Sequence, residues 1–502
     1  MKRMLAAIVA VLITGGVAGC SASNPAADES SGQHRLRVGL VFPPRKQLSP
    51  YTDDAAILTL LGAAEPLVSV DRGGRPTPVL AESWSRPDAG RVRLTLRRGV
   101  TFHEGTPLTA ALAADSMNRA AAAKPVPRAL VDIKLTAVAV DERVLEVRTT
   151  TPDPTLLHRL ATPQLVILAP RAYQRDPASP DPIGAGTGPY RLTSVQGVSA
   201  VTLQRYDGYW GGRPRLAGLD VRFLPDGAAR AGALRARELD LVNALPVAQL
   251  PNIREQRVIE VALPRTVSLY LVGTPGRVFA DPGLRAAVRA ATDPAAISAA
   301  IYEGRADPAE GLFGPASSWA APGRAAARAA APPLPAAGTP NGTKITLATY
   351  TDRPELPEMA SALAAAFGKR GFVVEPVVRE YSTLEPGVLA GRYDAVILSR
   401  SYVFDTADPV AFIRADFTCA GSYNVARFCD PRFDRRAAAA AALTDLPARL
   451  AATLNLEAEI LNRVVVVPLT HERARLGASP AVTNIAEDPY ERTLITVRTD
   501  VK

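Results

Sequence analysis

Residues 399–434 bring together side chains that could bind a ligand. Asp405, Asp408 and Asp416 lie in the first half of this stretch, and Cys419 and Cys429 lie in the second. The preceding apolar run, DAVILS, has polar ends and predicts a buried strand. Carboxylates directly after such a strand lie at the C-terminal edge of an open α/β sheet, where ligand crevices form. The stretch therefore predicts a ligand site, and the alternative is a loop whose acids are solvated.

The N-terminus predicts export. Lys2 and Arg3 precede an apolar run from Leu5 to Ile13, which is much shorter than the roughly 20 residues of a spanning helix. The run ends in Val-Ala-Gly-Cys, which resembles a bacterial lipobox and implies cleavage before Cys20 and lipidation of its thiol. The alternative is an ordinary signal peptide with a cysteine there by chance. Residues 21–33 are small and polar, as expected of a flexible tether.

The two other cysteines fit an exported protein. With Cys20 lipidated, Cys419 and Cys429 are the pair that remains, and their spacing and compartment predict a disulfide. Two thiols with no nearby histidine offer too few ligands for a metal, so we expect no metal site and no cofactor.

Composition excludes several other functions. The chain has 58 Lys and Arg against 49 Asp and Glu, but it has no run of basic residues, so nucleic-acid binding is not expected. His471-Glu472 begins like a zinc-protease motif, but Arg475 stands where the second histidine would be. Neither a G-x-S-x-G elbow nor a phosphate-binding loop is present, so we expect neither a hydrolase nor an ATPase.

The predicted elements include a parallel α/β unit. Residues 345–353 and 371–378 are predicted strands, with a helix over 358–369 between them. Together with residues 389–392 and the DAVILS strand, they give the order strand, helix, strand, helix, strand, which predicts a parallel sheet. Residues 311–342 are rich in proline and alanine and are predicted to form a connector.

Several motifs, in order along the chain, are similar to those of the family 5 extracellular solute-binding proteins, the receptors of peptide and nickel ABC importers. They include LAESW, LRRGVTFHEGTPLTA, GTGPYRL, LQRYDGYWGG and FADPGLRAAVRAATDP. The resemblance covers nearly all of the chain after the tether. It implies an α/β protein of the type II periplasmic-binding-protein class, with two lobes, an extra subdomain and a ligand enclosed by hinge closure.

The resemblance implies the following domain boundaries. They are a signal peptide over 1–19, a tether over 20–33, lobe I over 34–267 with a subdomain at about 52–185, lobe II over 268–472, and a C-terminal return to lobe I over 473–502. The chain would cross between the lobes near 264–270 and return near 470–475.

The same resemblance suggests ligand-binding residues. In the peptide-binding branch, an aspartate three residues after an aromatic pairs with the ligand's α-ammonium, and here Asp405 follows Tyr402. Asp408, before Pro409, is instead expected to cap a helix. Where dipeptide binders use an arginine for the ligand's carboxylate, this chain has Tyr350, with Arg353 nearby as a substitute.

A further position departs from the family pattern. Thr383 replaces an expected pocket tryptophan, and Tyr381 could compensate for it. These departures leave open a longer peptide or another ligand that carries a cation.

The sequence as a whole predicts a monomeric lipoprotein at the outer face of the bacterial cell membrane. It would capture a peptide or another amine and deliver it to an ABC permease that works with separate ATPase subunits. The alternative is a surface lipoprotein of the same fold that regulates the envelope or acts as a sensor without transport. Nickel or haem binding is an alternative within the family.

Overall fold

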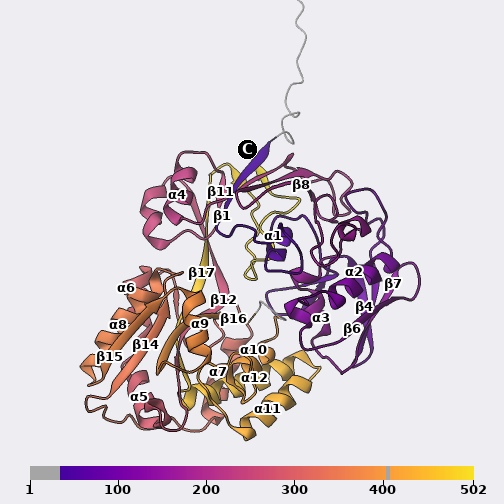
Figure 1. Ribbon diagram of the computed structural model, residues 1–502. Helices are drawn as coiled ribbons and strands as arrows, with labels where there is room; N and C mark the ends of the chain where they lie inside the picture. The colour runs from indigo at the N-terminus through magenta and orange to yellow at the C-terminus, as the bar shows by residue number, and fades with distance from the viewer. Residues whose placement is uncertain (1–33, 403–406) are drawn as a thin grey trace, which may run out of the picture.

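The computed structural model describes residues 34–402 and 407–502 (Figure 1). The predicted signal peptide, Cys20 and the tether lie outside the described residues, and so does Asp405. Among the residues that are described, no helix is long and apolar enough to cross a membrane.

A large mixed sheet runs through both parts of the molecule. Its neighbouring strands, in spatial order, are β15 (Val373–Arg379), β14 (Lys344–Tyr350), β16 (Ala395–Ser401), β12 (Arg257–Leu271), β17 (Val466–Ala478), β11 (Leu241–Val242), β1 (Arg35–Leu40), β10 (Gly218–Phe223), β9 (Ala200–Arg205) and β8 (Tyr190–Gln196). The short β13 (Asp307–Pro308) pairs with β17.

Two long antiparallel strands, β12 and β17, connect the two parts (Figure 1). At one end β17 pairs with β11, and at the other β12 pairs with β16. Their register is interrupted by a bulge between Ala262 and Thr266. A bulge bends a strand and leaves side chains off the regular ladder. The crossings predicted from the sequence fall on these two strands, and the domain boundaries themselves remain a proposal.

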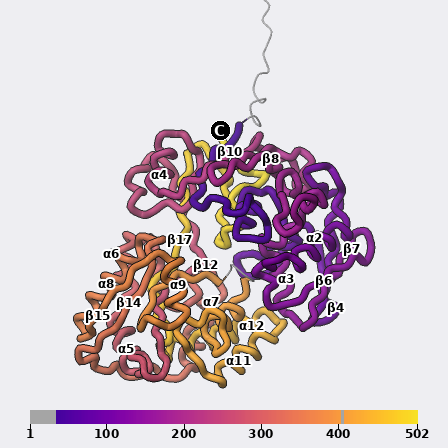
Figure 2. The backbone as a smooth tube through the Cα atoms, viewed as in Figure 1, coloured from indigo at the N-terminus to yellow at the C-terminus, as the bar shows by residue number. Residues whose placement is uncertain are grey.

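The N-terminal part includes a separate four-stranded sheet and several helices (Figure 2). The strands of this sheet are, in spatial order, β4 (Ala81–Asp88), β5 (Arg91–Leu96), β7 (Val144–Thr149) and β6 (Leu135–Ala139). A separate two-stranded sheet consists of β2 (Val68–Val70) and β3 (Pro76–Pro78). The helices of the N-terminal part are α1 (Ala55–Leu60), α2 (Ala110–Ala122), α3 (Leu156–Leu160) and α4 (Gly227–Arg235). On β5, Val92, Leu94 and Leu96 are buried alternately, as their spacing predicts.

The GTGPY motif marks a close approach of two backbone segments. A Cβ at Gly186 would lie 2.0 Å from the carbonyl oxygen of Ala63, and one at Gly188 would lie 2.2 Å from that of Gly62. Only glycine fits at these two positions, so this motif is part of the scaffold.

The second part contains the predicted parallel unit. β14 pairs in parallel with both β15 and β16, and the connecting helices are α8 (Glu355–Lys369) and α9 (Tyr381–Leu389). The other helices here are α5 (Pro282–Ala290), α6 (Pro294–Tyr302), α7 (Ala320–Ala330), α10 (Pro409–Phe417), α11 (Pro431–Ala442) and α12 (Leu446–Asn462). Asp281 and Asp293 cap α5 and α6 through their side chains, as expected of Asp-Pro steps.

The prediction of a connector without a helix is wrong for part of residues 311–342. Helix α7 forms over Ala320–Ala330, and extended chain follows it to residue 340. Pro322 lies in the first turn, where its missing N–H is tolerated, and the alanines and arginines that follow favour helix.

The C-terminal segment returns to the N-terminal part, where β18 (Val482–Thr483) pairs with β19 (Asp500–Val501). Buried apolar side chains from both parts form one continuous cluster, and a smaller cluster packs around α4. Because β14 and β16 contribute to the large cluster, a packed core supports their ends and can hold the side chains there in fixed positions.

Candidate ligand-binding site

The C-terminal ends of β14, β15 and β16 bring three tyrosines together. Tyr350 ends β14, and its ring packs edge-on against Tyr381 with the ring centroids 5.1 Å apart. The hydroxyl of Tyr381 lies 2.5 Å from that of Tyr423 and donates to Glu385 at 2.6 Å. Burial raises the pKa of all three tyrosines, so they are neutral hydrogen-bonding groups at physiological pH.

Arg400, near the end of β16, lies beside this aromatic cluster. Its guanidinium lies 3.9 Å from the ring centroid of Tyr423. It also donates two hydrogen bonds to Asp416, of 2.9 and 2.7 Å, and the side chain of Asp416 is fully buried. Burial alone would lower the pKa of Arg400, but the Asp416 carboxylate raises it above its usual value. Arg400 is thus held by an internal anion and stacks on a tyrosine.

A group of four charged residues lies where the strands cross between the two parts. Arg353 donates to Glu472 at 2.7 Å, and Arg265 lies 3.4 Å from the same carboxylate. Arg265 also lies 3.8 Å from Glu491 of the C-terminal segment. The group therefore joins the loop after β14, both connecting strands and the C-terminal segment.

Burial shifts the pKa values in this group. It lowers the pKa of Arg265, and the nearby charge of Arg353 lowers it further. Burial also raises the pKa of Glu491, against the effect of Arg265. For Arg353, burial acts to lower the pKa, but Glu472 raises it overall. Arg353 already has an internal carboxylate partner in the position where a ligand carboxylate was predicted to bind.

The structure places Tyr402 in the core. Its side chain is 7% exposed, its hydroxyl lies 2.8 Å from that of Ser317, and its ring packs edge-on against Phe313. Burial raises the pKa of Tyr402. Its contact with the ligand remains a prediction, as does that of Asp405.

Asp408 begins α10, as predicted. One carboxylate oxygen accepts from the N–H of Ala411 at 2.9 Å, and the carboxylate also receives hydrogen bonds of 2.8 and 2.6 Å from Arg449. Both side chains are almost fully buried. Beyond this helix, Cys419 and Cys429 form a disulfide with their Cα atoms 4.4 Å apart.

Two buried histidines, one in each part of the molecule, serve as structural groups. His471 on β17 lies 2.8 Å from the hydroxyl of Thr266, and burial lowers its pKa to about 4. His103 pairs with the carbonyl of Gly188 at 2.9 Å, and burial likewise lowers its pKa to about 4. Within residues 34–402 and 407–502, no group of three or more His, Cys, Asp or Glu side chains could hold a metal ion.

Sequence reasoning missed Arg400, Tyr423, Glu472 and Arg265. A signal existed for Arg400, because it directly follows the DAVILS strand and Ser399. No local signal could place Arg265 beside Glu472, because their contact depends on how β12 and β17 pair around the bulge.

The comparison with solved structures defines the fold class, the α/β fold of the type II periplasmic binding proteins. NikA from Brucella suis in complex with Fe(III)-EDTA superposes with a TM-score of 0.80 at 22% identity, covering 93% of this chain and 100% of that one. DppA from Helicobacter pylori in complex with the peptide STSA gives a TM-score of 0.71 at 20% identity, with coverage of 94% and 99%.

The family model for bacterial extracellular solute-binding proteins, family 5, matches residues 75–424, and the chain belongs to this family. Among curated relatives, the nickel-binding protein NikA of Staphylococcus aureus is 25% identical over 62% of this chain and 60% of its own length. The glutathione-binding protein GsiB of Escherichia coli K12 is 27% identical over 51% of each chain. The heme-binding protein A of Haemophilus influenzae is 25% identical over 82% of each chain. The chain thus spans about half to three fifths of the length of the first relatives it matches.

Proposed function

We propose that this protein is the substrate-binding subunit of an ABC importer, anchored outside the cell membrane by lipid on Cys20. We propose that it captures a peptide or another amine-bearing solute between its two lobes and delivers it to a permease. Membership of the solute-binding family supports the general function. DppA from Helicobacter pylori, which has the same fold, is in complex with the peptide STSA, so the fold is compatible with this ligand class.

We infer the class of ligand from Arg353 and Arg400, which lie at the C-terminal edge of the sheet and already have carboxylate partners. Glu472 accepts from Arg353, and Asp416 accepts from Arg400. A ligand carboxylate would have to displace one of these buried anions, which costs several kcal/mol. A cationic ligand meets no such competition, and the rings of Tyr350 and Tyr381 offer aromatic surface beside it.

Asp405 supplies the negative charge in this proposal. A closed interlobe site removes an ammonium group from water, and a carboxylate with good hydrogen-bond geometry is needed to offset that cost. Since Arg353 and Arg400 already pair with internal carboxylates, we do not expect the site to require a free C-terminus at a fixed distance. The proposal therefore favours peptides of varied length over strict dipeptide recognition.

Calorimetry with short peptides tests this assignment. We expect Asp405→Asn to weaken binding of free-amine peptides by roughly 30-fold or more, as for loss of one partner in a buried charge pair. Peptides with an acetylated N-terminus should bind the native protein about as weakly as free peptides bind the variant. Asp176→Asn, on an exposed loop, is the matched control and should leave affinity unchanged. Equal affinity of native protein and the Asp405 variant for free-amine peptides would remove Asp405 from the site.

Two other functions use the same fold. Glu472 already pairs with Arg353, and Tyr350 stands where dipeptide binders have an arginine, so neither residue favours capture of a ligand carboxylate. This departure from the family pattern favours a lipoprotein that acts in the envelope or as a sensor without transport. Peptide uptake that is unchanged in a strain lacking the protein would favour that role. The second alternative is binding of a nickel chelate or haem, as in the nickel-binding and heme-binding relatives. If it holds, calorimetry should show saturable binding of that ligand even by a variant in which Asp405 is replaced.

A further inference from the structure

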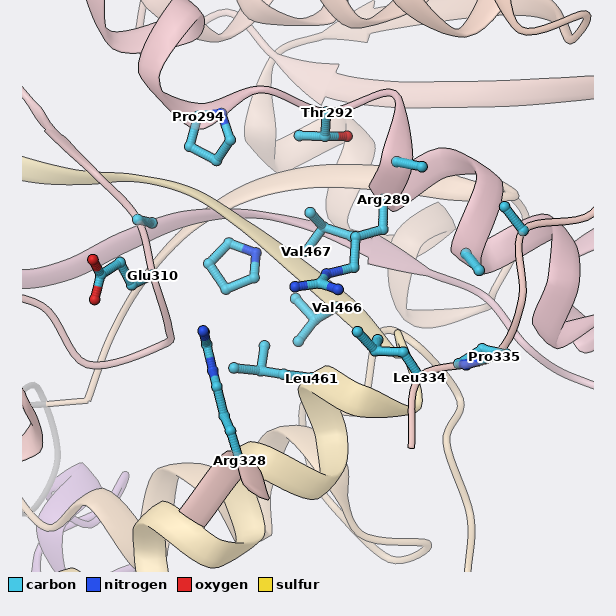
Figure 3. A pocket seen from close by; sticks show the side chains of 15 residues that line it. Arg289, Thr292, Pro294, Glu310, Arg328, Leu334, Pro335, Leu461, Val466 and Val467 are labelled. Carbon is cyan, nitrogen blue, oxygen red and sulfur yellow. The ribbon is translucent and has the colours of Figure 1, made fainter. Parts of the chain in front are cut away.

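A cavity lies in the second part, beside the proline-rich connector (Figure 3). It has a volume of about 370 Å³ and lies between α5, the turn into α6, the end of α7, residues 334–337 of the connector and the start of β17. Val466, in its wall, is six positions before Glu472 on β17, which corresponds to roughly 20 Å along a strand. The cavity is therefore separate from the candidate interlobe site.

Two arginines extend into this cavity. Arg289 comes from α5 and Arg328 from α7, and their guanidinium groups point toward one another across the cavity (Figure 3). Neither guanidinium makes a hydrogen bond or an ion pair with any residue in 34–402 or 407–502. Burial lowers the pKa of Arg289, and the charge of Arg328 lowers it further, so the two cations repel each other.

The acids nearby are already engaged. Glu310 lies at the edge of the cavity, but it is largely exposed and its carboxylate lies 3.4 Å from Arg324. The buried Glu457 accepts from the backbone N–H groups of Leu312 and Phe313. Arg289, Arg328 and Glu310 thus give the lining of the cavity a net positive charge, and the charge of Arg328 also acts on the buried Glu457.

The rest of the lining is apolar. Leu461 of α12, Val466 and Val467 of β17 and Leu334 of the connector form this surface (Figure 3). Leu334 is 44% exposed, so apolar surface remains uncovered next to the two cations. A volume of this size is within the range of small-molecule sites, roughly 300–1,000 Å³.

We propose that this cavity is a second ligand site, which binds a small organic carboxylate with a compact apolar body. The carboxylate would lie between Arg289 and Arg328 and accept forked hydrogen bonds from them. The apolar body would cover Leu334, which is 44% exposed, and remove its surface from water. The carboxylate would also offset the repulsion between the two arginines.

Benzoate is a suitable probe, with benzamide as its neutral isostere and inorganic phosphate as an oxyanion without an apolar body. Calorimetry on the full exported protein should show saturable benzoate binding that is at least about tenfold tighter than that of either comparison compound, a difference of about 1.4 kcal/mol. Arg289→Gln and Arg328→Gln should each weaken benzoate binding about tenfold, and the double variant should abolish it.

Arg435→Gln is the matched control, because Arg435 is an exposed arginine on α11 with no ion pair to another described residue. It should bind benzoate as the native protein does. Asp405→Asn should also leave benzoate binding intact, so a failure of the interlobe proposal is distinguishable from a failure of this one. Benzoate binding that persists in the double arginine variant, or binding of benzamide or phosphate as tight as that of benzoate, would overturn the proposal.

Discussion

Glu472 on β17 accepts a hydrogen bond of 2.7 Å from Arg353, the residue predicted to bind a ligand carboxylate. The same carboxylate lies 3.4 Å from Arg265 on β12. The side chain of Glu472 is 7% exposed, and that of Arg265 is 12% exposed. One buried acid therefore serves two cations, and it fixes the loop after β14 to the strands that run between the two parts.

Replacing Glu472 by glutamine tests this arrangement. Glutamine keeps the shape and one acceptor but leaves the buried guanidinium of Arg265 and the partly exposed one of Arg353 without their shared anion. We expect the free energy of unfolding to fall by roughly 3 kcal/mol, the lower range for breaking a buried ion pair. Urea unfolding followed by circular dichroism measures this change. Glu82→Gln, which removes a more exposed partner of Arg143, should cost less than about 1 kcal/mol. Equal effects of the two variants would show that Glu472 is not a structural anion.

Local patterns were sufficient to predict much of the scaffold. The alternation of apolar residues accounts for β5, the Asp-Pro steps mark the starts of α5, α6 and α10, and the order of strands and helices predicted the parallel unit around β14. In each case the deciding interaction is between residues close in sequence. The proline-rich composition of residues 311–342 did not indicate helix α7, but Pro322 lies in the first turn, where a proline is compatible with a helix.

The candidate site was less predictable, because its pairings are not local. Nothing in the residues around Arg353 indicates that Glu472 will pair with its guanidinium, since two strands, β16 and β12, lie between β14 and β17 in the sheet. Similarly, the stacking of Arg400 on Tyr423 depends on the path of the chain after α10. Sequence reasoning identified the edge of the sheet and several of its tyrosines, but not which charges neutralise each other there.

Asp408 combines a helix cap with a buried ion pair, so its replacement should be more costly than loss of a cap alone. In Asp408→Asn, Arg449 keeps its charge but loses a carboxylate bound at 2.8 and 2.6 Å. We expect a loss of about 3–5 kcal/mol in the free energy of unfolding. Asp445 caps α12 by the same type of bond at an exposed position, so Asp445→Asn should cost about 1 kcal/mol or less. Thermal and urea unfolding of both variants give the comparison, and similar losses would contradict a structural role for the Arg449 pair.

The disulfide between Cys419 and Cys429 predicts a measurable loss of stability on removal. It closes a short loop between α10 and α11, and a loop of this size constrains the unfolded chain by about 3 kcal/mol, less any strain. The double variant Cys419→Ser, Cys429→Ser should therefore unfold at lower urea concentration than the oxidised protein. Addition of a reductant should lower the stability of the native protein to a similar extent and leave the double variant unchanged. A reductant effect of equal size on both proteins would exclude this bond as its cause.

Glu65 predicts a decrease in stability as the pH rises. Its carboxylate accepts from Tyr209 at 2.7 Å, Thr187 at 2.9 Å and Trp210 at 3.1 Å. Burial nevertheless raises the pKa of Glu65 to about 7, against the effect of these three donors. The folded protein therefore holds a proton that the unfolded chain has released between about pH 4.5 and 7. Stability from this group is fully present below that range and is lost as the pH rises through it, by roughly 3 kcal/mol in all.

Glu65→Gln isolates this contribution. The amide is neutral at every pH, and its N–H group can donate to the hydroxyl of Tyr209 while its oxygen accepts from Thr187 and Trp210. His103 and His471 act in the opposite direction, because burial lowers their pKa values to about 4. The unfolded chain therefore takes up protons at these histidines first, and the protein loses stability as the pH falls below about 6.5. Subtracting the free energy of unfolding of the variant from that of the native protein cancels the histidine contribution. We expect this difference to fall steadily from about pH 5 to pH 8. Parallel profiles for the two proteins would show that Glu65 is ionised in the folded state at neutral pH and that its three donors outweigh its burial.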